Sequence, residues 1–195
     1  GFFYDYGYGF SRISHYFSLA SFTPLWAGLA TPEQAKQMIK HLPKFETPNG
    51  LTIGAKMSLA KPIDLSKIQD RYHAAIEEIV KPKQWDYPNI WSPLEYLTVI
   101  GLLRYGYKDE AKRIMENSVK THARLFRKYK TFFEKIDGKT GEPSVGYAYA
   151  MQEGFGWTNA IFYRYIQILK ALDAGQQIYK EPVTKTPPYD LAILH

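Results

Sequence analysis

Apolar residues recur every three or four positions along most of the chain, which is the spacing of one face of an α-helix. After residue 60 this pattern predicts helices at residues 65–80, from 93 to about 106, at 108–129 and at 158–172. The helices follow one another without alternating strands, so a parallel sheet is not expected. The pattern predicts an all-α fold of antiparallel helix pairs, in which the loops at one end can pool their side chains into one cleft.

Two further helices are predicted near the start of the chain. Residues 16–29 are apolar enough for a buried helix, with Pro24 as a kink or a restart. Residues 31–34 read Thr-Pro-Glu-Gln and supply an N-cap, a first-turn proline and a capping-box partner. We therefore expect a helix that runs from these residues to about Leu42.

Similar signals predict the boundaries of the later elements. Residues 92–95, Ser-Pro-Leu-Glu, indicate a second capping box, and Thr158 is expected to cap the last helix. Residues 131–137 look extended, and residues 138–154 form a loop rich in glycine. The inward-facing candidates of the helix at 108–129 are Ala111, Ile114, Val119, Ala123 and Phe126.

Composition adds one unusual feature, which is the aromatic content. The 195 residues fit one domain or part of a larger one, and the hydrophobic (45%) and charged (23%) fractions are ordinary for a globular protein. The chain holds 16 tyrosines, 11 phenylalanines and 4 tryptophans. Such side chains provide amphipathic surface at low entropy cost, as binding clefts require.

Charge and cysteine content exclude several classes of function. The net charge of +6 is dispersed, and its densest cluster, in residues 124–130, suits the solvated end of a helix. No nucleic-acid-binding module accompanies this charge, so a nucleic-acid partner is not expected. The absence of cysteine excludes disulfides and cysteine-ligated metal, and fits a reducing compartment.

The sequence also shows no apolar run long enough to span a membrane and no secretory signal. We therefore expect a cytoplasmic protein without a membrane partner. The chain opens at Gly1 without an initiating Met, so it is expected to be an excised, processed or tagged piece whose true N-terminus is not seen.

The segment 84–93, Gln-Trp-Asp-Tyr-Pro-Asn-Ile-Trp-Ser-Pro, is the first candidate for binding chemistry. Its two prolines restrict the backbone, so the segment is a shaped loop. The indoles of Trp85 and Trp91 and the carboxylate of Asp86 suit a ligand with apolar faces and hydroxyl edges, such as a sugar. The alternative is a loop whose tryptophans plug the core.

Glu134 is the candidate for catalysis. It lies in Phe-Phe-Glu-Lys-Ile-Asp, residues 132–137, where two phenylalanines partly desolvate the carboxylate and Lys135 favours its ionised form. Such a group suits a general base. The alternative, which the local sequence favours, is an ordinary surface glutamate paired with lysine.

The loop at residues 147–159 is the third candidate segment, and it ends in Gln-Glu-Gly-Phe-Gly-Trp-Thr-Asn. Its glycines allow a tight backbone path around Phe155 and Trp157, and the amide of Gln152 can bind hydroxyl groups. The alternative for Trp157 is core packing. The five histidines show no paired metal-ligand spacing, and neither a phosphate-binding loop nor a hydrolase serine elbow is present, so neither metal nor cofactor is expected.

These three segments, in this order, resemble the trehalases of glycoside hydrolase family 37. The family pattern Gln-Trp-Asp-x-Pro-x-Gly-Trp-x-Pro is matched at residues 84–93, with Ile90 in place of glycine. The pattern Glu-Lys-Tyr-Asp is matched at residues 134–137, with Ile136 in place of tyrosine. The ending Gln-x-Gly-Phe-Gly-Trp-Thr-Asn is matched at residues 152–159.

The resemblance extends beyond these segments. Residues 24–26 and 31–35 are similar to the family's Ala-Pro-Leu-Trp and Ser-Pro-Glu-Gln-Ala stretches, and order and approximate spacing agree over residues 1–172. The resemblance implies an (α/α)6 barrel, an inverting mechanism and no metal. It assigns the general base to Glu134. The side chains that it places in the substrate site are Trp85, Asp86, Trp91, Tyr149, Gln152, Phe155 and Trp157.

The resemblance also implies that the chain is one part of a catalytic barrel. The family's general acid is an aspartate in a Glu-Ser-Gly-Trp-Asp segment, which this chain lacks and which is expected upstream of Gly1. Residues 1–174 are then the C-terminal part of the barrel and residues 175–195 a surface tail. The expected partners are a small carbohydrate and the missing N-terminal part of the barrel, without which the chain should be inactive.

Departures from the family pattern leave other functions open. Ala148 stands where a substrate-contacting glutamate is expected, and residues 58–82 look like an extra helix. The site for the second sugar is therefore expected to differ. One alternative is a related (α/α)6 α-glucosidase that acts on another glucoside, such as glucosylglycerate or an oligosaccharide end. Another alternative is a non-catalytic sugar-binding or structural fragment.

Overall fold

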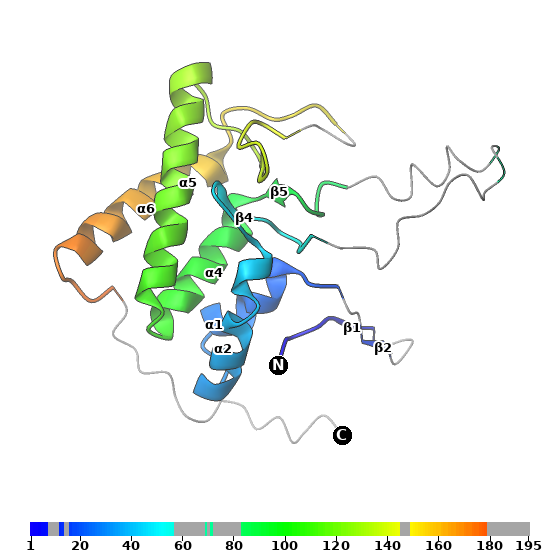
Figure 1. Cartoon of the computed structure of the whole chain (residues 1–195). Coiled ribbons are helices and arrows are strands. Elements are labelled where there is room, and N and C mark those ends of the chain that lie inside the picture. The colour runs from blue at the N-terminus through cyan, green and yellow to red at the C-terminus, as the bar shows by residue number, and fades with distance from the viewer. Residues whose placement is uncertain are drawn as a thin grey trace.

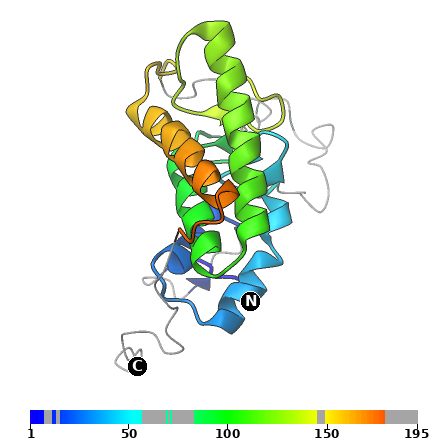
Figure 2. The ribbon, with the colours of Figure 1, turned by 90° about the vertical axis from the view of Figure 1, so that its left-hand side faces the viewer.

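The computed structural model describes residues 1–7, 12–13, 16–56, 69, 71, 83–144 and 149–178. Within these residues, three long helices form the centre of the molecule (Figure 1). They are α4 (Ser92–Arg104), α5 (Lys108–Tyr129) and α6 (Gly156–Asp173). Helix α5 runs back along α4, and α6 runs back along α5 (Figure 1). The turned view shows α6 beside α5 and in front of α4 (Figure 2). The prediction of an all-α fold is confirmed.

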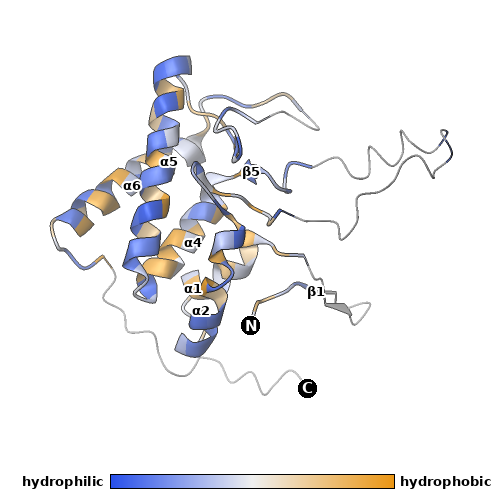
Figure 3. Ribbon diagram, viewed as in Figure 1, coloured by the Kyte–Doolittle hydropathy of each residue, from blue (hydrophilic) through white to orange (hydrophobic). Residues whose placement is uncertain are grey.

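The amphipathic pattern located α5 correctly, because its ends coincide with the predicted range 108–129. Hydrophilic residues cover much of the outer side of α5, while apolar residues concentrate where the helices pack together (Figure 3). One inward candidate was wrong. Phe126 is 42% exposed and rests on Phe132, with 5.0 Å between the ring centroids, and the neighbouring Leu125 is buried instead.

The predicted helix at residues 16–29 is instead two short elements. A 3-10 turn, η2 (Leu19–Phe22), passes into α1 (Thr23–Trp26), and Pro24 lies in the first turn of α1. A proline there restarts the helix because it has no N–H to donate to the preceding turn. The restart predicted at Pro24 is therefore correct, although the long helix is not.

The capping box at Thr31 is present at the start of α2 (Pro32–Ile39). The Thr31 hydroxyl accepts a hydrogen bond from the Gln34 backbone N–H, and the Gln34 side chain accepts one from the Thr31 N–H. The helix ends at Ile39, before the predicted Leu42, and a 3-10 turn, η3 (Leu42–Lys44), follows it.

The two later caps were wrong, because tertiary contacts use the polar groups instead. Helix α4 has Trp91 at its N-cap position without a side-chain cap, and the Glu95 side chain accepts a hydrogen bond from the Leu51 N–H. Helix α6 begins earlier than predicted, and Thr158 lies inside its first turn. The Thr158 hydroxyl donates to the Phe133 carbonyl at 2.8 Å.

The strands of the described residues pair into three antiparallel ladders of two strands each. They are β1 (Tyr6–Gly7) with β2 (Arg12–Ile13), β3 (Glu46–Thr47) with β4 (Gly50–Leu51), and β5 (Asn89–Ile90) with β6 (Ile136–Asp137). The third ladder matters for function, because β5 continues the tryptophan-containing loop and β6 follows Glu134.

The apolar core lies between the helices and the N-terminal elements. Tyr165 of α6, Phe22 and Phe45 are its largest fully buried members. No helix among the described residues is both long and apolar enough to cross a membrane. The helix predicted at residues 65–80, apart from residues 69 and 71, and the tail after residue 178 lie outside the described residues, as does Ala148.

Candidate active site

Three tryptophans from two distant segments lie side by side. The rings of Trp85 and Trp91 are stacked, with centroids 4.4 Å apart and planes 12° apart, and the Trp157 ring lies 6.2 Å from Trp91. Trp91 is only 3% exposed, whereas Trp85 is 48% and Trp157 50% exposed. Trp91 is therefore packed in the interior, whereas the indoles of Trp85 and Trp157 present apolar surface to solvent. We call these three residues the tryptophan platform.

The loop that carries Trp85 is shaped by hydrogen bonds of its own polar residues. The Asp86 carboxylate accepts the Lys83 N–H at 2.8 Å, and the Asn89 amide donates to the Lys83 carbonyl at 3.0 Å. The Trp91 indole N–H donates to the Gln84 carbonyl at 2.9 Å. Asp86 thus has a structural role in closing this loop.

Asp86 also faces Tyr16. The Tyr16 hydroxyl lies 3.5 Å from Asp86 Oδ1. Burial, together with the negative charge of Asp86, raises the pKa of Tyr16 to about 12. Tyr16 therefore stays neutral and able to donate a hydrogen bond throughout the physiological range.

Glu134 is buried, with 4% of its surface exposed, so the alternative of an ordinary surface glutamate is wrong. Both carboxylate oxygens have partners. Lys135 Nζ lies 3.0 Å from Oε2, and the Tyr149 hydroxyl donates to Oε1 at 2.7 Å. This hydrogen bond to Glu134, with burial, raises the pKa of Tyr149. The pairing with lysine and the desolvation of the Glu134 carboxylate were predicted, but the burial of Lys135 was not.

Lys135 connects the carboxylate to the tryptophan platform. Its side chain is fully buried, and its Nζ lies 5.6 Å from the Trp91 ring centroid and 5.4 Å from that of Tyr149. Both distances are within the range of cation–π attraction. Glu134, Lys135, Trp91 and Tyr149 therefore form one connected cluster, which adjoins the exposed indoles through Trp91.

The loop before α6 completes this arrangement. The Phe155 ring packs edge-on against Trp157, with centroids 5.3 Å apart. The Gln152 carbonyl accepts the Glu134 N–H at 3.0 Å, while the exposed Gln152 side chain donates to the Ala150 carbonyl. Gly154 adopts a φ of 65°, a conformation that favours glycine, and its N–H donates to the Phe132 carbonyl.

All of the site residues predicted from the sequence thus come from segments that the fold brings together. Trp85, Trp91, Trp157 and Phe155 form one aromatic group, and Tyr149 and the Gln152 backbone contact Glu134. Asp86 is connected to the group through its loop.

Sequence reasoning missed Asn89 and Ser144. The fully buried Asn89 accepts a short hydrogen bond from the Ser144 hydroxyl, and its backbone carbonyl accepts the Ile53 N–H. Asn89 therefore joins the tryptophan loop to the segment that follows β6. Its position in a turn next to proline gave no signal of this role.

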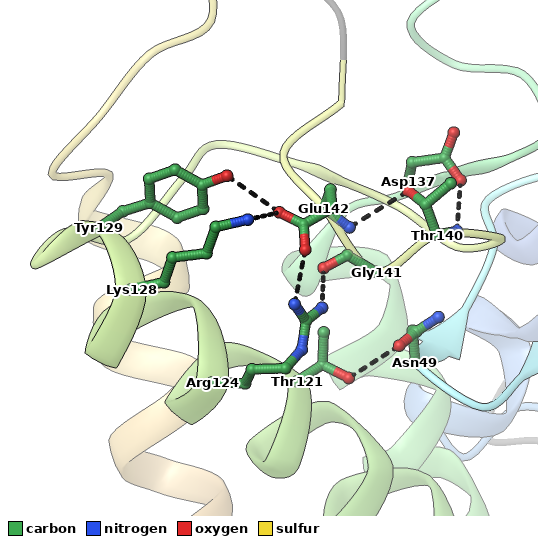
Figure 4. Close-up of polar contacts among 9 residues, drawn as sticks. All are labelled: Asn49, Thr121, Arg124, Lys128, Tyr129, Asp137, Thr140, Gly141 and Glu142. Atoms are coloured by element: carbon green, nitrogen blue, oxygen red, sulfur yellow. Dashed lines mark hydrogen bonds and ion pairs between the residues drawn. The ribbon is translucent and has the colours of Figure 1, made fainter.

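Sequence reasoning also missed a clamp on the loop after β6. Glu142 accepts hydrogen bonds from Arg124, Lys128 and Tyr129 at the end of α5 (Figure 4). Its hydrogen bonds, with that from Arg124 first, lower the pKa of Glu142 to about 2. The spacing of Arg124 and Lys128, one helical turn apart, was the available signal that these charges share a partner.

Two departures from the family pattern face each other in the structure. Ile90 and Ile136 are directly opposed in the β5–β6 ladder, and both are 1% exposed. They pack together with Leu125. The resemblance expected glycine and tyrosine at these two positions. Two side chains of medium size therefore fill the space that a small and a large one would share.

The described residues contain no group of three or more histidine, cysteine, aspartate or glutamate side chains that could hold a metal ion. The chemistry that the cluster itself offers is that of a buried carboxylate beside exposed aromatic surface. Such a carboxylate can accept a proton from a water molecule held against a ligand on the platform.

Comparison with known proteins identifies the family of the chain. The family described as Trehalase matches residues 1–170. A cytosolic neutral trehalase of Emericella nidulans is 31% identical over an alignment of 206 residues, which covers 99% of this chain and 25% of the relative. A cytosolic neutral trehalase of Saccharomyces cerevisiae is 32% identical over 175 residues, covering 83% of this chain and 21% of the relative.

Solved structures support the same fold. The neutral trehalase Nth1 from Saccharomyces cerevisiae has a TM-score of 0.65 and 30% identity over 89% of this chain and 28% of that one. A GH63 mannosylglycerate hydrolase from Thermus thermophilus, solved with glucose, has a TM-score of 0.60 over 84% of this chain and 35% of that one. At 18% identity, this match supports a shared fold and nothing further.

The chain spans about a quarter of the length of the curated relatives that it matches. Its helices correspond to part of the (α/α)6 toroid of these enzymes. With the family matched over residues 1–170, the chain belongs to the trehalase family, glycoside hydrolase family 37.

Proposed function

We propose that the complete protein hydrolyses α,α-trehalose to glucose, and that this chain supplies the general base and one wall of the glucose site. The observation that carries the proposal is the buried Glu134 carboxylate, which contacts Tyr149 and Lys135. The Lys135 ammonium in turn lies over the ring of Trp91, the indole on which the exposed Trp85 stacks. The relatives named as trehalases support the choice of substrate.

In the proposed reaction, Glu134 takes a proton from a water molecule while the water oxygen attacks C1 of one glucose unit. The bond between C1 and the bridging oxygen breaks, and a general acid protonates that oxygen. Attack from the face opposite the leaving group inverts the configuration at C1. An inverting enzyme holds its two carboxyl groups about 6.5–9.5 Å apart, which leaves room for the water.

Each remaining site residue has a place in this proposal. Trp85 and Trp157 stack against the apolar faces of the sugar, supported by Trp91 and Phe155. Gln152 binds sugar hydroxyls through its exposed amide, and Asp86 holds the loop of Trp85 in shape. The general acid comes from a part of the barrel that the 195 residues do not cover.

We further propose that residues 1–174 are the C-terminal part of the catalytic barrel, and that they pair with its N-terminal part. Alone, the chain is expected to bind glucose weakly and to hydrolyse nothing, because it has only one of the two carboxyl groups. The names of the relatives favour the cytosol as the compartment.

The experiment that tests this function is early-time proton NMR of the complete protein acting on trehalose. Inversion releases β-glucose from the attacked unit and α-glucose from the leaving unit, in equal amounts before mutarotation. Release of α-glucose alone would exclude inversion. The same assay is run with glucosylglycerate and with maltose. Hydrolysis of either one without hydrolysis of trehalose would exclude trehalose as the substrate.

A further inference from the structure

We infer that Lys135 is a positioning residue for Glu134: its ammonium holds Oε2 as counter-ion and leaves Oε1 as the oxygen that accepts the proton from water. The inference deepens the proposed function and rests on it. Its basis is the environment of three groups, the Lys135 ammonium, the Glu134 carboxylate and the Tyr149 hydroxyl.

The contact between Lys135 and Glu134 is not a consequence of their adjacency in sequence. Side chains of successive residues in extended backbone point to opposite faces. Here the backbone bends at Glu134, and Lys135 Nζ returns to within 3.0 Å of Oε2. The fold therefore brings together two neighbours that a regular strand would separate.

The Lys135 ammonium is buried, so a counter-ion is needed to offset the cost of removing its charge from water. The Lys135 side chain has 0% exposure and that of Glu134 has 5%. Burying a lone ammonium or a lone carboxylate is costly, and each charge here compensates the other. The ring faces of Trp91 and Tyr149 also lie near Lys135 Nζ.

The two oxygens of Glu134 differ in what surrounds them. Oε2 faces the fully buried ammonium, whereas Oε1 faces the hydroxyl of Tyr149, a residue that is 41% exposed. A carboxylate oxygen has two lone-pair sites, so Oε1 can accept from Tyr149 and from a water molecule together. We therefore assign the Oε1 edge, on the side of the partly exposed Tyr149, to the attacking water.

Removing the ammonium should change the protonation of the base. A carboxyl that remains buried without its counter-ion favours the neutral form, and a neutral carboxyl cannot accept a proton from water. In Lys135→Met, the acidic limb of the kcat/KM profile should move to higher pH by about one unit or more, since an opposite charge at this distance has an effect of about that size. Part of the lost activity should return at alkaline pH.

The test is the pH dependence of kcat/KM in the complete protein for Lys135→Met, Lys135→Gln and Lys135→Arg. The control is Lys139→Met, which removes an exposed lysine from the turn after β6. We expect the acidic limb to move in both neutral variants and to stay in place in Lys135→Arg and in the control. The glutamine variant provides the same readout where the methionine variant does not fold.

The outcomes separate this inference from the proposed function. Uniform loss of activity at every pH, with the acidic limb unmoved in the neutral variants, would overturn the positioning role of Lys135. Full activity of Glu134→Gln in the same assay would instead overturn Glu134 as the base, whatever Lys135 does. Loss of activity in Glu134→Gln with a shifted limb in the neutral Lys135 variants supports both.

Discussion

A buried carboxyl outside the active site should make this fold less stable as the pH rises. Glu95 of α4 has no exposed surface, and its Oε2 accepts the Leu51 N–H of β4 at 2.7 Å. Burial raises the pKa of Glu95 from 4.5 to about 7, although the hydrogen bond from Leu51 acts in the opposite direction. The change to consider is Glu95→Gln, which keeps an acceptor for Leu51 and removes the titration.

The direction in which stability changes with pH follows from the protonation of Glu95 in the folded and in the unfolded chain. Below pH 4 the carboxyl is protonated whether the chain is folded or unfolded, so it has no pH-dependent effect on stability. Between pH 4.5 and 7 the unfolded chain loses the proton while the folded chain retains it, so the free energy of unfolding falls as the pH rises. Above pH 7 the penalty is complete. Each pKa unit is worth about 1.4 kcal/mol, so the full penalty is about 3 kcal/mol.

Hydrogen exchange of the segment around Leu51 measures this penalty in the complete protein. At equal pH, protection of the Leu51 amide in Glu95→Gln should exceed that in the unmodified protein, by little at pH 5 and by up to about 3 kcal/mol at pH 8. Glu116→Gln, at an exposed position of α5, controls for loss of one negative charge. A difference between Glu95→Gln and the unmodified protein that is constant from pH 5 to pH 8 would refute the reasoning.

Three further predictions concern the site. Asn89→Ala should lower the free energy of unfolding by about 1–3 kcal/mol, because it leaves the Ser144 hydroxyl without its buried acceptor, and urea unfolding measures this. Trp85→Ala should leave thermal stability almost unchanged because Trp85 is half exposed, but weaken glucose binding about tenfold or more in calorimetry; unchanged affinity would exclude Trp85 from the site. Ile90→Gly should destabilise the protein, and the added change Ile136→Tyr should recover part of the loss; additive effects in this double-mutant cycle would show that the two positions do not compensate each other.

The sequence predicted the parts of this fold that depend on a long repeating pattern. Helix α5 was located at both ends because its apolar stripe extends over about six turns between clear boundaries. The restart at Pro24 was predicted, but the run at residues 16–29 was too short a pattern to show that its two elements have only four residues each. The caps expected at residues 92–95 and at Thr158 failed for a different reason. The side chains that a local rule assigns to a helix end are used by partners far away in sequence, Leu51 and Phe133.

The candidate site likewise has features that the sequence predicted and features that it did not. Its segments could be identified from the family resemblance, and the antiparallel pairing of β5 with β6 explains why they meet. Desolvation of Glu134 was predicted from its phenylalanine neighbours, but the burial of Lys135 with it could not be, because two adjacent charged residues are most often exposed and paired in solvent. What buries them is the packing of Trp91 and Tyr149, which arrive from segments before and after them in the chain.

The central claim is that Glu134 is the general base, and the most direct measurement is the kcat/KM for trehalose of Glu134→Gln in the complete protein. The amide has nearly the same shape and cannot accept the proton from water. We predict a loss of about 10²–10⁴-fold, with sugar binding retained in calorimetry. A loss of less than about tenfold would contradict the assignment, because a general base contributes more than that.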